Sequence, residues 1–75
     1  MIKYKDVKIG DVFEIPMVFR KSRIIVVGCS IFFGLQMITS LGTTLEMDKE
    51  VFEEYVKRDM KLVARNKRVI VSVEN

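Results

Sequence analysis

The hydrophobic positions of this chain follow the period of a β-strand in most segments and the period of a helix in one. Val12 to Ile15 predicts a strand, and Pro16 marks a sheet edge or a bend because proline cannot donate to a strand ladder. We expect Met17 to Arg20 to resume this strand and Lys21-Ser22 to form the tip of the next turn. Ile24 to Val27 is β-branched throughout, which favours a second strand over a helix.

Gly28-Cys29-Ser30 predicts a short break made of small residues. From Ile31 onward the residues have the two-residue period of a strand. One face of this predicted third strand carries Ile31, Phe33, Leu35 and Met37, and the other carries Phe32, Gly34, Gln36 and Ile38. We expect the first face to build the core. Ser40-Leu41-Gly42 then predicts a hairpin turn, and Thr43 to Met47 predicts a further strand.

The one helical segment starts after Asp48, a residue type that caps helix N-termini well. The predicted helix runs from Lys49 to Arg58. Its apolar stripe at helical spacing consists of Val51, Phe52, Tyr55 and Val56. The chain then predicts a C-terminal hairpin, with strands at Met60 to Ala64 and Val69 to Val73 around a turn at Arg65-Asn66-Lys67.

Together these elements predict a single, mainly β domain over residues 1–75 with one helix. The order of VKIGDVFEI, a central meander, a short helix and closing strands resembles a small SH3-like barrel. The segment from Leu41 to Val63 also resembles stretches of small uncharacterised tailed-phage proteins. The resemblance implies a small antiparallel barrel of about five to six strands, with the α-helix near residues 49–58 preceding the C-terminal hairpin. It transfers no functional residues, because fold analogy does not define a site.

The uncharged run from Ile24 to Leu45 raises a second interpretation, since about 20 apolar residues can span a membrane. Three glycines, Gln36 and the β-branched first half argue against a membrane helix. The rest of the chain would also be left as fragments too small to fold alone. We therefore favour three consecutive strands and keep a single-span membrane protein as an alternative.

Composition narrows the classes of chemistry. The chain has no histidine, and Cys29 is its single cysteine. Zinc sites of the usual Cys/His kind and nucleophile–histidine dyads are therefore excluded, and no internal disulfide can form. We expect no enzyme activity, no metal and no cofactor. Because no signal-peptide pattern is present, we expect a cytoplasmic location.

The second face of the predicted third strand is the first candidate site. Outward-facing Phe32 and Ile38, with Gln36 between them, would leave an exposed apolar patch, and such patches mark partner surfaces or oligomer contacts. Tyr55 is expected at the rim of this protein-binding surface. The alternative at this point is that the helix or the C-terminal hairpin covers the patch.

Basic residues supply the second candidate site. The net charge is +3, and the acids concentrate around the predicted helix. The basic residues gather near two predicted turns, Arg20, Lys21 and Arg23 at the first and Arg65, Lys67 and Arg68 at the second. Two basic hairpin tips at one end of a barrel would suit a nucleic-acid backbone. The alternative is that these charges only keep the exposed turns soluble. Nucleic-acid sites usually combine basic with aromatic residues, and Phe19 is the only aromatic residue beside either cluster.

We therefore predict a non-enzymatic binding module that acts on a protein partner or by self-association. The phage resemblance implies a small regulator or inhibitor of a host protein as one instance. A nucleic-acid-binding barrel that uses the six basic residues is the main alternative. Sequestration of a nucleotide or another small molecule would use the same basic loops, between subunits.

Overall fold

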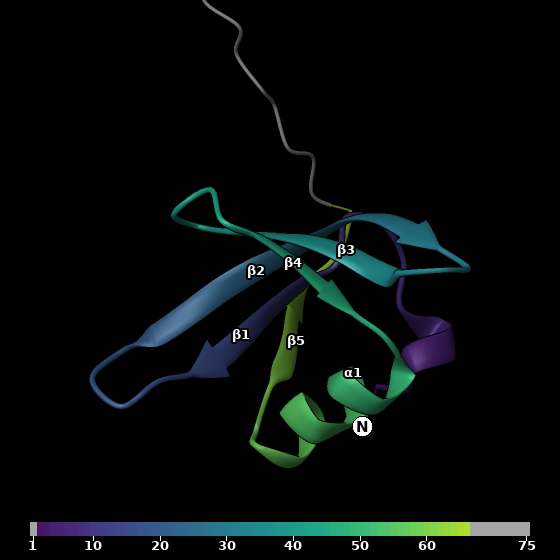
Figure 1. Ribbon diagram of the computed structural model, residues 1–75. Helices are drawn as coiled ribbons and strands as arrows, with labels where there is room; N and C mark the ends of the chain where they lie inside the picture. Colours follow the sequence, from purple (N-terminus) through teal and green to yellow (C-terminus); the bar gives the residue numbers. More distant parts are fainter. Residues whose placement is uncertain (1, 67–75) are drawn as a thin grey trace, which may run out of the picture.

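The computed structural model describes residues 2–66, and these residues contain five antiparallel strands in one sheet, one α-helix and a short 3-10 helix (Figure 1). In chain order the elements are η1 (Tyr4–Asp6), β1 (Val12–Pro16), β2 (Lys21–Ser30), β3 (Gly34–Thr39), β4 (Thr44–Met47), α1 (Lys49–Lys57) and β5 (Lys61–Ala64). The prediction of a mainly β domain with one helix is confirmed.

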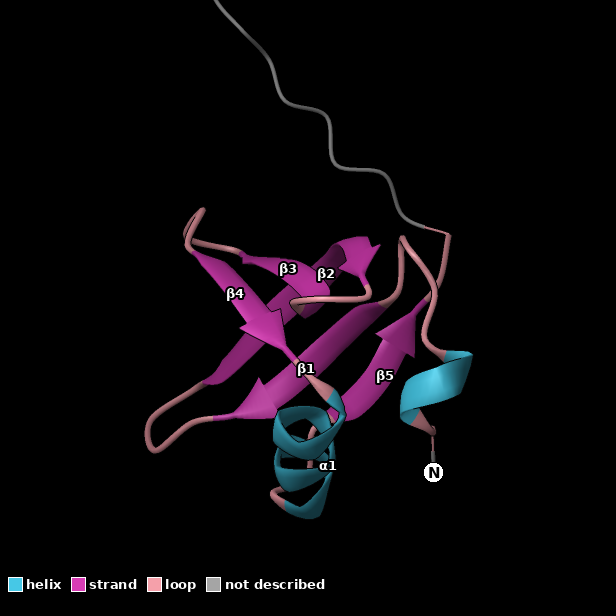
Figure 2. Ribbon diagram, turned by 45° about the vertical axis from the view of Figure 1, so that its right-hand side comes forward, coloured by secondary structure: helices cyan, strands magenta, loops and turns pink. Residues whose placement is uncertain are grey.

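The strand order in the sheet is β4-β3-β2-β1-β5. Strands β1 to β4 form a meander of hairpins, and β5 returns to pair with β1. Among the described residues β4 and β5 are therefore the two edges, and the sheet is not a closed barrel. Figure 2 shows that the sheet is strongly twisted and that α1 connects the end of β4 to the start of β5. The SH3-like barrel stays a prediction.

The core lies between the inner face of this twisted sheet and α1. Phe13 of β1 meets Phe52 of α1 edge to face, with ring centroids 5.6 Å apart. Such aromatic pairs stabilise beyond the area they bury. The buried hydrophobic residues are Phe13, Ile15, Ile24, Val26, Leu35, Met37, Met47, Phe52 and Met60. The helix thus covers the inner face of the sheet through Phe52.

The first hairpin differs from the prediction. Lys21 and Ser22 belong to β2, and the loop is formed by residues 17–20, where the Met17 N–H donates to the Arg20 carbonyl over 2.7 Å. Pro16 ends β1 beyond the last residue of that strand that pairs with β5. Because β5 does not pair with Pro16, the proline does not require β1 to lie at an edge of the sheet. The proline stops the strand, whereas we expected the strand to resume after it.

The second hairpin also turns later than predicted. The predicted small-residue break at residues 28–30 is paired strand that runs on to Ser30, and a bulge precedes it, marked by a register shift between Val26 and Gly28. A bulge inserts an extra residue without ending the strand. The turn comes at residues 31–33, so the prediction that Ile31 and Phe33 build the core is wrong. Leu35 and Met37 are buried as predicted, and the hairpin turn at residues 40–42 is confirmed.

Both ends of α1 are set by local hydrogen bonds. The Asp48 carboxylate accepts the Val51 N–H over 2.9 Å, as expected of an N-cap. At the other end the Met60 N–H donates to Tyr55 and the Asp59 N–H donates to Val56. This pair of bonds is a Schellman motif, which satisfies the last carbonyl groups of the helix.

The uncharged run at residues 24–45 forms most of β2, all of β3 and the start of β4, as the strand interpretation predicted. Within residues 2–66 no helix has the length and apolar character needed to cross a membrane. The predicted strand at residues 69–73, together with Lys67 and Arg68, lies outside the described residues.

Candidate binding surfaces

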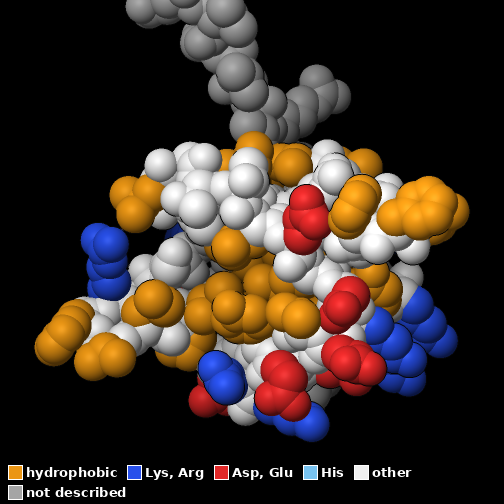
Figure 3. Space-filling view, viewed as in Figure 1, with side chains coloured by type: hydrophobic (Ala, Val, Ile, Leu, Met, Phe, Trp, Pro, Cys, Tyr) orange, Lys and Arg blue, Asp and Glu red, His pale blue; other side chains and the backbone are white. Residues whose placement is uncertain are grey.

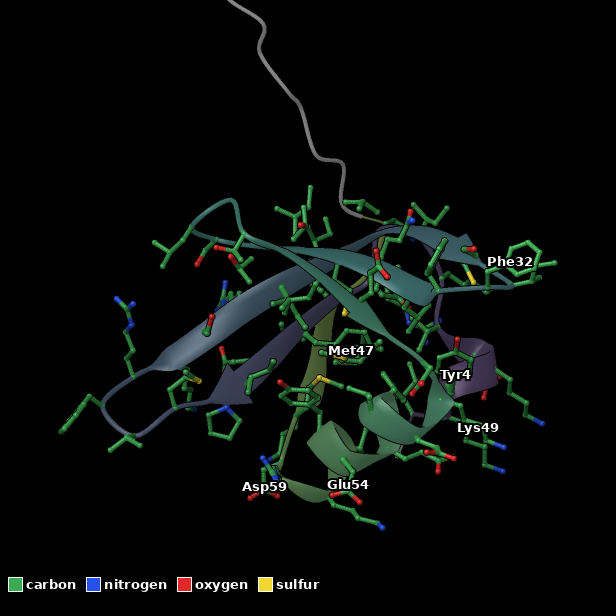
Figure 4. The ribbon with its side chains drawn as sticks, viewed as in Figure 1. Tyr4, Phe32, Met47, Lys49, Glu54 and Asp59 are labelled. Atoms are coloured by element: carbon green, nitrogen blue, oxygen red, sulfur yellow. The ribbon has the colours of Figure 1, made fainter. Side chains whose placement is uncertain are left out.

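The turn between β2 and β3 presents three consecutive large apolar side chains to solvent. We call residues 31–33 the apolar loop. Ile31 is 95% exposed, Phe32 84% and Phe33 60%. Figure 4 shows Phe32 at the outer tip of this turn. Contiguous apolar surface of this kind is costly in water and marks a contact site.

The backbone of the apolar loop is held in place from both sides. The Ser30 hydroxyl accepts the N–H groups of Phe32 and Phe33 over 3.1 and 3.4 Å. Gly34, with φ of +78°, packs against the backbone of Met47 and Asp48. These contacts restrain the backbone of the loop, and such pre-organisation lowers the cost of ordering it when a partner binds.

Tyr4 lies on the same side of the molecule as the apolar loop (Figure 4). Its ring stands edge-on to Phe52, with centroids 5.8 Å apart. Partial burial raises the pKa of the Tyr4 hydroxyl above its ordinary 10.0, and the nearby Cys29 and Asp48 raise this pKa further. Cys29 is exposed and lies in β2 just before the apolar loop.

The four residues predicted to bind protein are not brought together. Phe32 is in the apolar loop, whereas Gln36 and Ile38 lie on the outer face of β3. Tyr55 is half-buried against the core on α1, which covers the inner face. The helix therefore does not cover the Ile38 face. Of the predicted set, Phe32 alone belongs to the loop.

The outer face of the sheet carries a weaker apolar row. Ile38 pairs with Ile25 and Thr44, and Ile25 pairs with Val12, which in turn pairs with Ala64. Directly paired residues share one face of an antiparallel sheet. All of these residues except Thr44 are half-buried, so the row is less exposed than the apolar loop.

The basic residues that we predicted to bind nucleic acid do not share one end of the fold. Lys21 and Arg23 both reach Glu14, at 3.5 and 3.4 Å, beside the β1–β2 loop that contains Arg20. Arg65 lies 3.8 Å from the buried Asp11, at the opposite end of β1. Of the four residues that the structure describes, three therefore have a carboxylate partner, and the two groups are separated by the length of a strand.

A second apolar tip occurs at the β1–β2 turn, where Val18 and Phe19 are 90% and 98% exposed. Figure 3 shows hydrophobic side chains projecting from both ends of the molecule. Sequence reasoning missed both tips because it assigned residues 17–20 and Ile31 and Phe33 to strands. The Ser30 and Gly34 that flank the apolar loop were the available signal, since both residue types favour turns.

Fold and surface together define a small mainly β domain with a pre-organised apolar loop. Comparisons with protein-family models, with curated proteins and with solved structures find no match to this chain. The resemblance to SH3-like and tailed-phage proteins therefore has no support beyond the sequence pattern itself.

Proposed function

We propose that this protein is a non-enzymatic binding module that contacts a protein partner through its apolar loop. The observation that supports this proposal is the exposure of Ile31, Phe32 and Phe33 on a turn fixed by Ser30 and Gly34. Exposed aromatic side chains on a rigid support are typical of residues that dominate binding energy at interfaces. A small regulator or inhibitor with an SH3-like fold is the form of this proposal that the sequence pattern favours.

The test compares wild type with Phe32→Asp and with Phe19→Asp as the matched control. Both phenylalanines are exposed on hairpin turns, so neither substitution should change the free energy of unfolding by more than about 0.5 kcal/mol. A partner captured from native extract, with nuclease added, would be purified and titrated with each variant by calorimetry. We expect Phe32→Asp to weaken binding by about 2 kcal/mol or more, as for an interface hot spot.

Phe19→Asp should leave that affinity unchanged. Equal loss of affinity in both variants, or no loss in either, would refute the assignment to the apolar loop. Self-association is measured in parallel by light scattering of the wild type. A dimer that Phe32→Asp converts to a monomer would identify a second copy as the partner.

Nucleic-acid binding stays the weaker proposal, because Lys21, Arg23 and Arg65 have carboxylate partners. Binding to a phosphate backbone weakens steeply as salt rises. Tight binding to single- or double-stranded nucleic acid that is lost on reversing the charges of Arg20, Lys21 and Arg23 would favour it over the protein partner.

A further inference from the structure

An open groove of about 610 Å³ lies between the N-terminal segment and α1. Its apolar surface comes from both walls. Ile2 and Tyr4 contribute from the N-terminal side and Val56 from the helix, and the buried Phe52 lies beneath them. Its size falls within the usual range of about 300–1,000 Å³ for small-molecule sites. The groove is separate from the apolar loop, which contributes no residue to its lining.

Four lysines surround this apolar surface. The lining includes Lys3, Lys5, Lys49 and Lys57, against Glu53 as its single acid. Lys57 reaches Glu54 at 3.5 Å, whereas the other three lysines form no ion pair with any residue among 2–66. Figure 3 shows basic side chains on the side of the molecule where η1 lies, with acidic side chains beside them over α1, and Figure 4 places Lys49 below Tyr4 at this site. The groove therefore combines an apolar base with a cationic rim.

Two other kinds of occupant fit the groove less well. The α1 wall offers an extended peptide no free backbone groups to pair with, because a helix uses its own N–H and C=O groups internally. A second copy of this chain would have to insert one of its apolar tips. The Val18-Phe19 tip is flanked by Arg20, Lys21 and Arg23, so like charges would meet at the lysine rim. The apolar loop at residues 31–33 has no charged neighbour in sequence, so it offers no anion to the lysines.

We propose that this groove binds a free single-chain anionic amphiphile, that is, a fatty acid or a similar acyl anion. The hydrocarbon chain lies along Ile2, Tyr4 and Val56. The carboxylate lies among the lysines, where it gains charge-assisted hydrogen bonds. This site is independent of the proposed protein contact, because no residue of the apolar loop takes part.

The probe is laurate, titrated by calorimetry below its critical micelle concentration into the untagged full chain. An N-terminal tag is avoided because Ile2 and Lys3 line the groove. We expect saturable one-to-one binding. The series octanoate, decanoate and laurate should bind about fourfold more tightly for each added CH₂ that is buried. Chemical-shift changes should centre on Ile2, Tyr4 and Val56.

The test of the rim is the double variant Lys5→Glu/Lys49→Glu, with Lys8→Glu/Arg20→Glu as the control of equal net charge. The control residues are exposed, do not line the groove and form no ion pair within the described part of the chain. We expect the first variant to weaken laurate binding roughly tenfold, because two attractive charges become repulsive. The control variant and Phe32→Asp should retain it. Thermal unfolding confirms that each variant is folded.

Three outcomes would overturn the proposal. The first is no saturable binding up to the solubility limit of laurate. The second is binding that survives Lys5→Glu/Lys49→Glu and is lost in Phe32→Asp, since the chain would then occupy the apolar loop. The third is association with phosphatidylglycerol vesicles without any binding of monomeric laurate, which would make the lysine cluster a membrane contact. The first and third outcomes do not bear on the protein contact at the apolar loop, whereas the second would place laurate on that loop.

Discussion

At the scale of single residues, three glycines that look equivalent in the sequence have different surroundings. A Cβ on Gly34 would collide with the backbone of Met47 and lie 2.9 Å from the Cα of Asp48, at a φ of +78°. A Cβ on Gly42 would meet nothing within 4 Å, although its φ is also positive. A Cβ on Gly28 would meet the end of the flexible Gln36 side chain. Of these three, only Gly34 is required for both its conformation and its size.

We predict that Gly34→Ala lowers the free energy of unfolding by about 2–4 kcal/mol, from left-handed strain together with overpacking. Gly42→Ala should cost about 1 kcal/mol, from the strain alone. Urea denaturation of the two variants measures the difference. Equal destabilisation of both would show that the backbone of Met47 and Asp48 moves aside freely.

Tyr4 provides a pH-dependent prediction. Because burial and the charges of Cys29 and Asp48 raise its pKa in the folded chain, the unfolded chain loses the hydroxyl proton first as pH rises. Stability should therefore fall above pH 10, up to the raised folded pKa, and should be insensitive to this group at lower pH. Tyr4→Phe should show a shallower decline in urea denaturation between pH 9 and pH 11. Identical slopes would mean that Tyr4 titrates equally in both states.

At the scale of elements, the residue that follows the C-terminus of α1 has a backbone conformation that suits glycine better than aspartate. Asp59 follows the helix in the left-handed region, with φ of 67°, at the Schellman position where glycine is usual. We predict that Asp59→Gly raises the free energy of unfolding by about 1 kcal/mol, because the Cβ penalty is removed. Glu53→Gly, inside the same helix, should lower it by about 1 kcal/mol. Thermal unfolding of the pair tests the opposite signs, and destabilisation by Asp59→Gly would contradict the prediction.

The elements were predictable from the sequence wherever local rules acted alone. Asp48 marked the start of the helix, and the β-branched residues before Gly28 marked a strand. The turns were predicted less well, because alternation continues in the sequence through residues 31–33 while the backbone reverses there. Ser30 and Gly34 control that reversal through one hydroxyl and one positive φ, and neither interrupts the hydrophobic pattern.

The candidate sites were less predictable than the elements. Phe32 was identified as exposed, but the sequence could not show that Ile38 and Tyr55 lie on opposite faces of the sheet. The lysine-rimmed groove joins Lys5 to Lys49, which are far apart in the chain. Such a pairing depends on how η1 packs against α1, and no local pattern encodes it.

At the scale of the whole molecule, Asp11 joins the start of β1 to the end of β5. This residue is 1% exposed, and its carboxylate accepts the Lys8 N–H over 2.9 Å and faces Arg65 at 3.8 Å. We predict that Asp11→Ala lowers the free energy of unfolding by about 1–3 kcal/mol, because a part-buried N–H loses its partner. Arg65→Ala should cost less than 1 kcal/mol, since the arginine is partly exposed. Equal effects of the two variants in urea denaturation would show that the ion pair dominates.

The pairing of β5 with β1 also has a kinetic consequence. Hairpins β1–β2, β2–β3 and β3–β4 pair strands that are neighbours in the sequence. The pairing of β5 with β1 instead joins the last described strand to the first. Contacts between distant parts of a chain slow folding, because the loop between them must close first. During synthesis, β1 therefore lacks its second neighbour until β5 has been made. We expect the hairpins of the meander to pair before β5 pairs with β1, because their contacts close shorter loops.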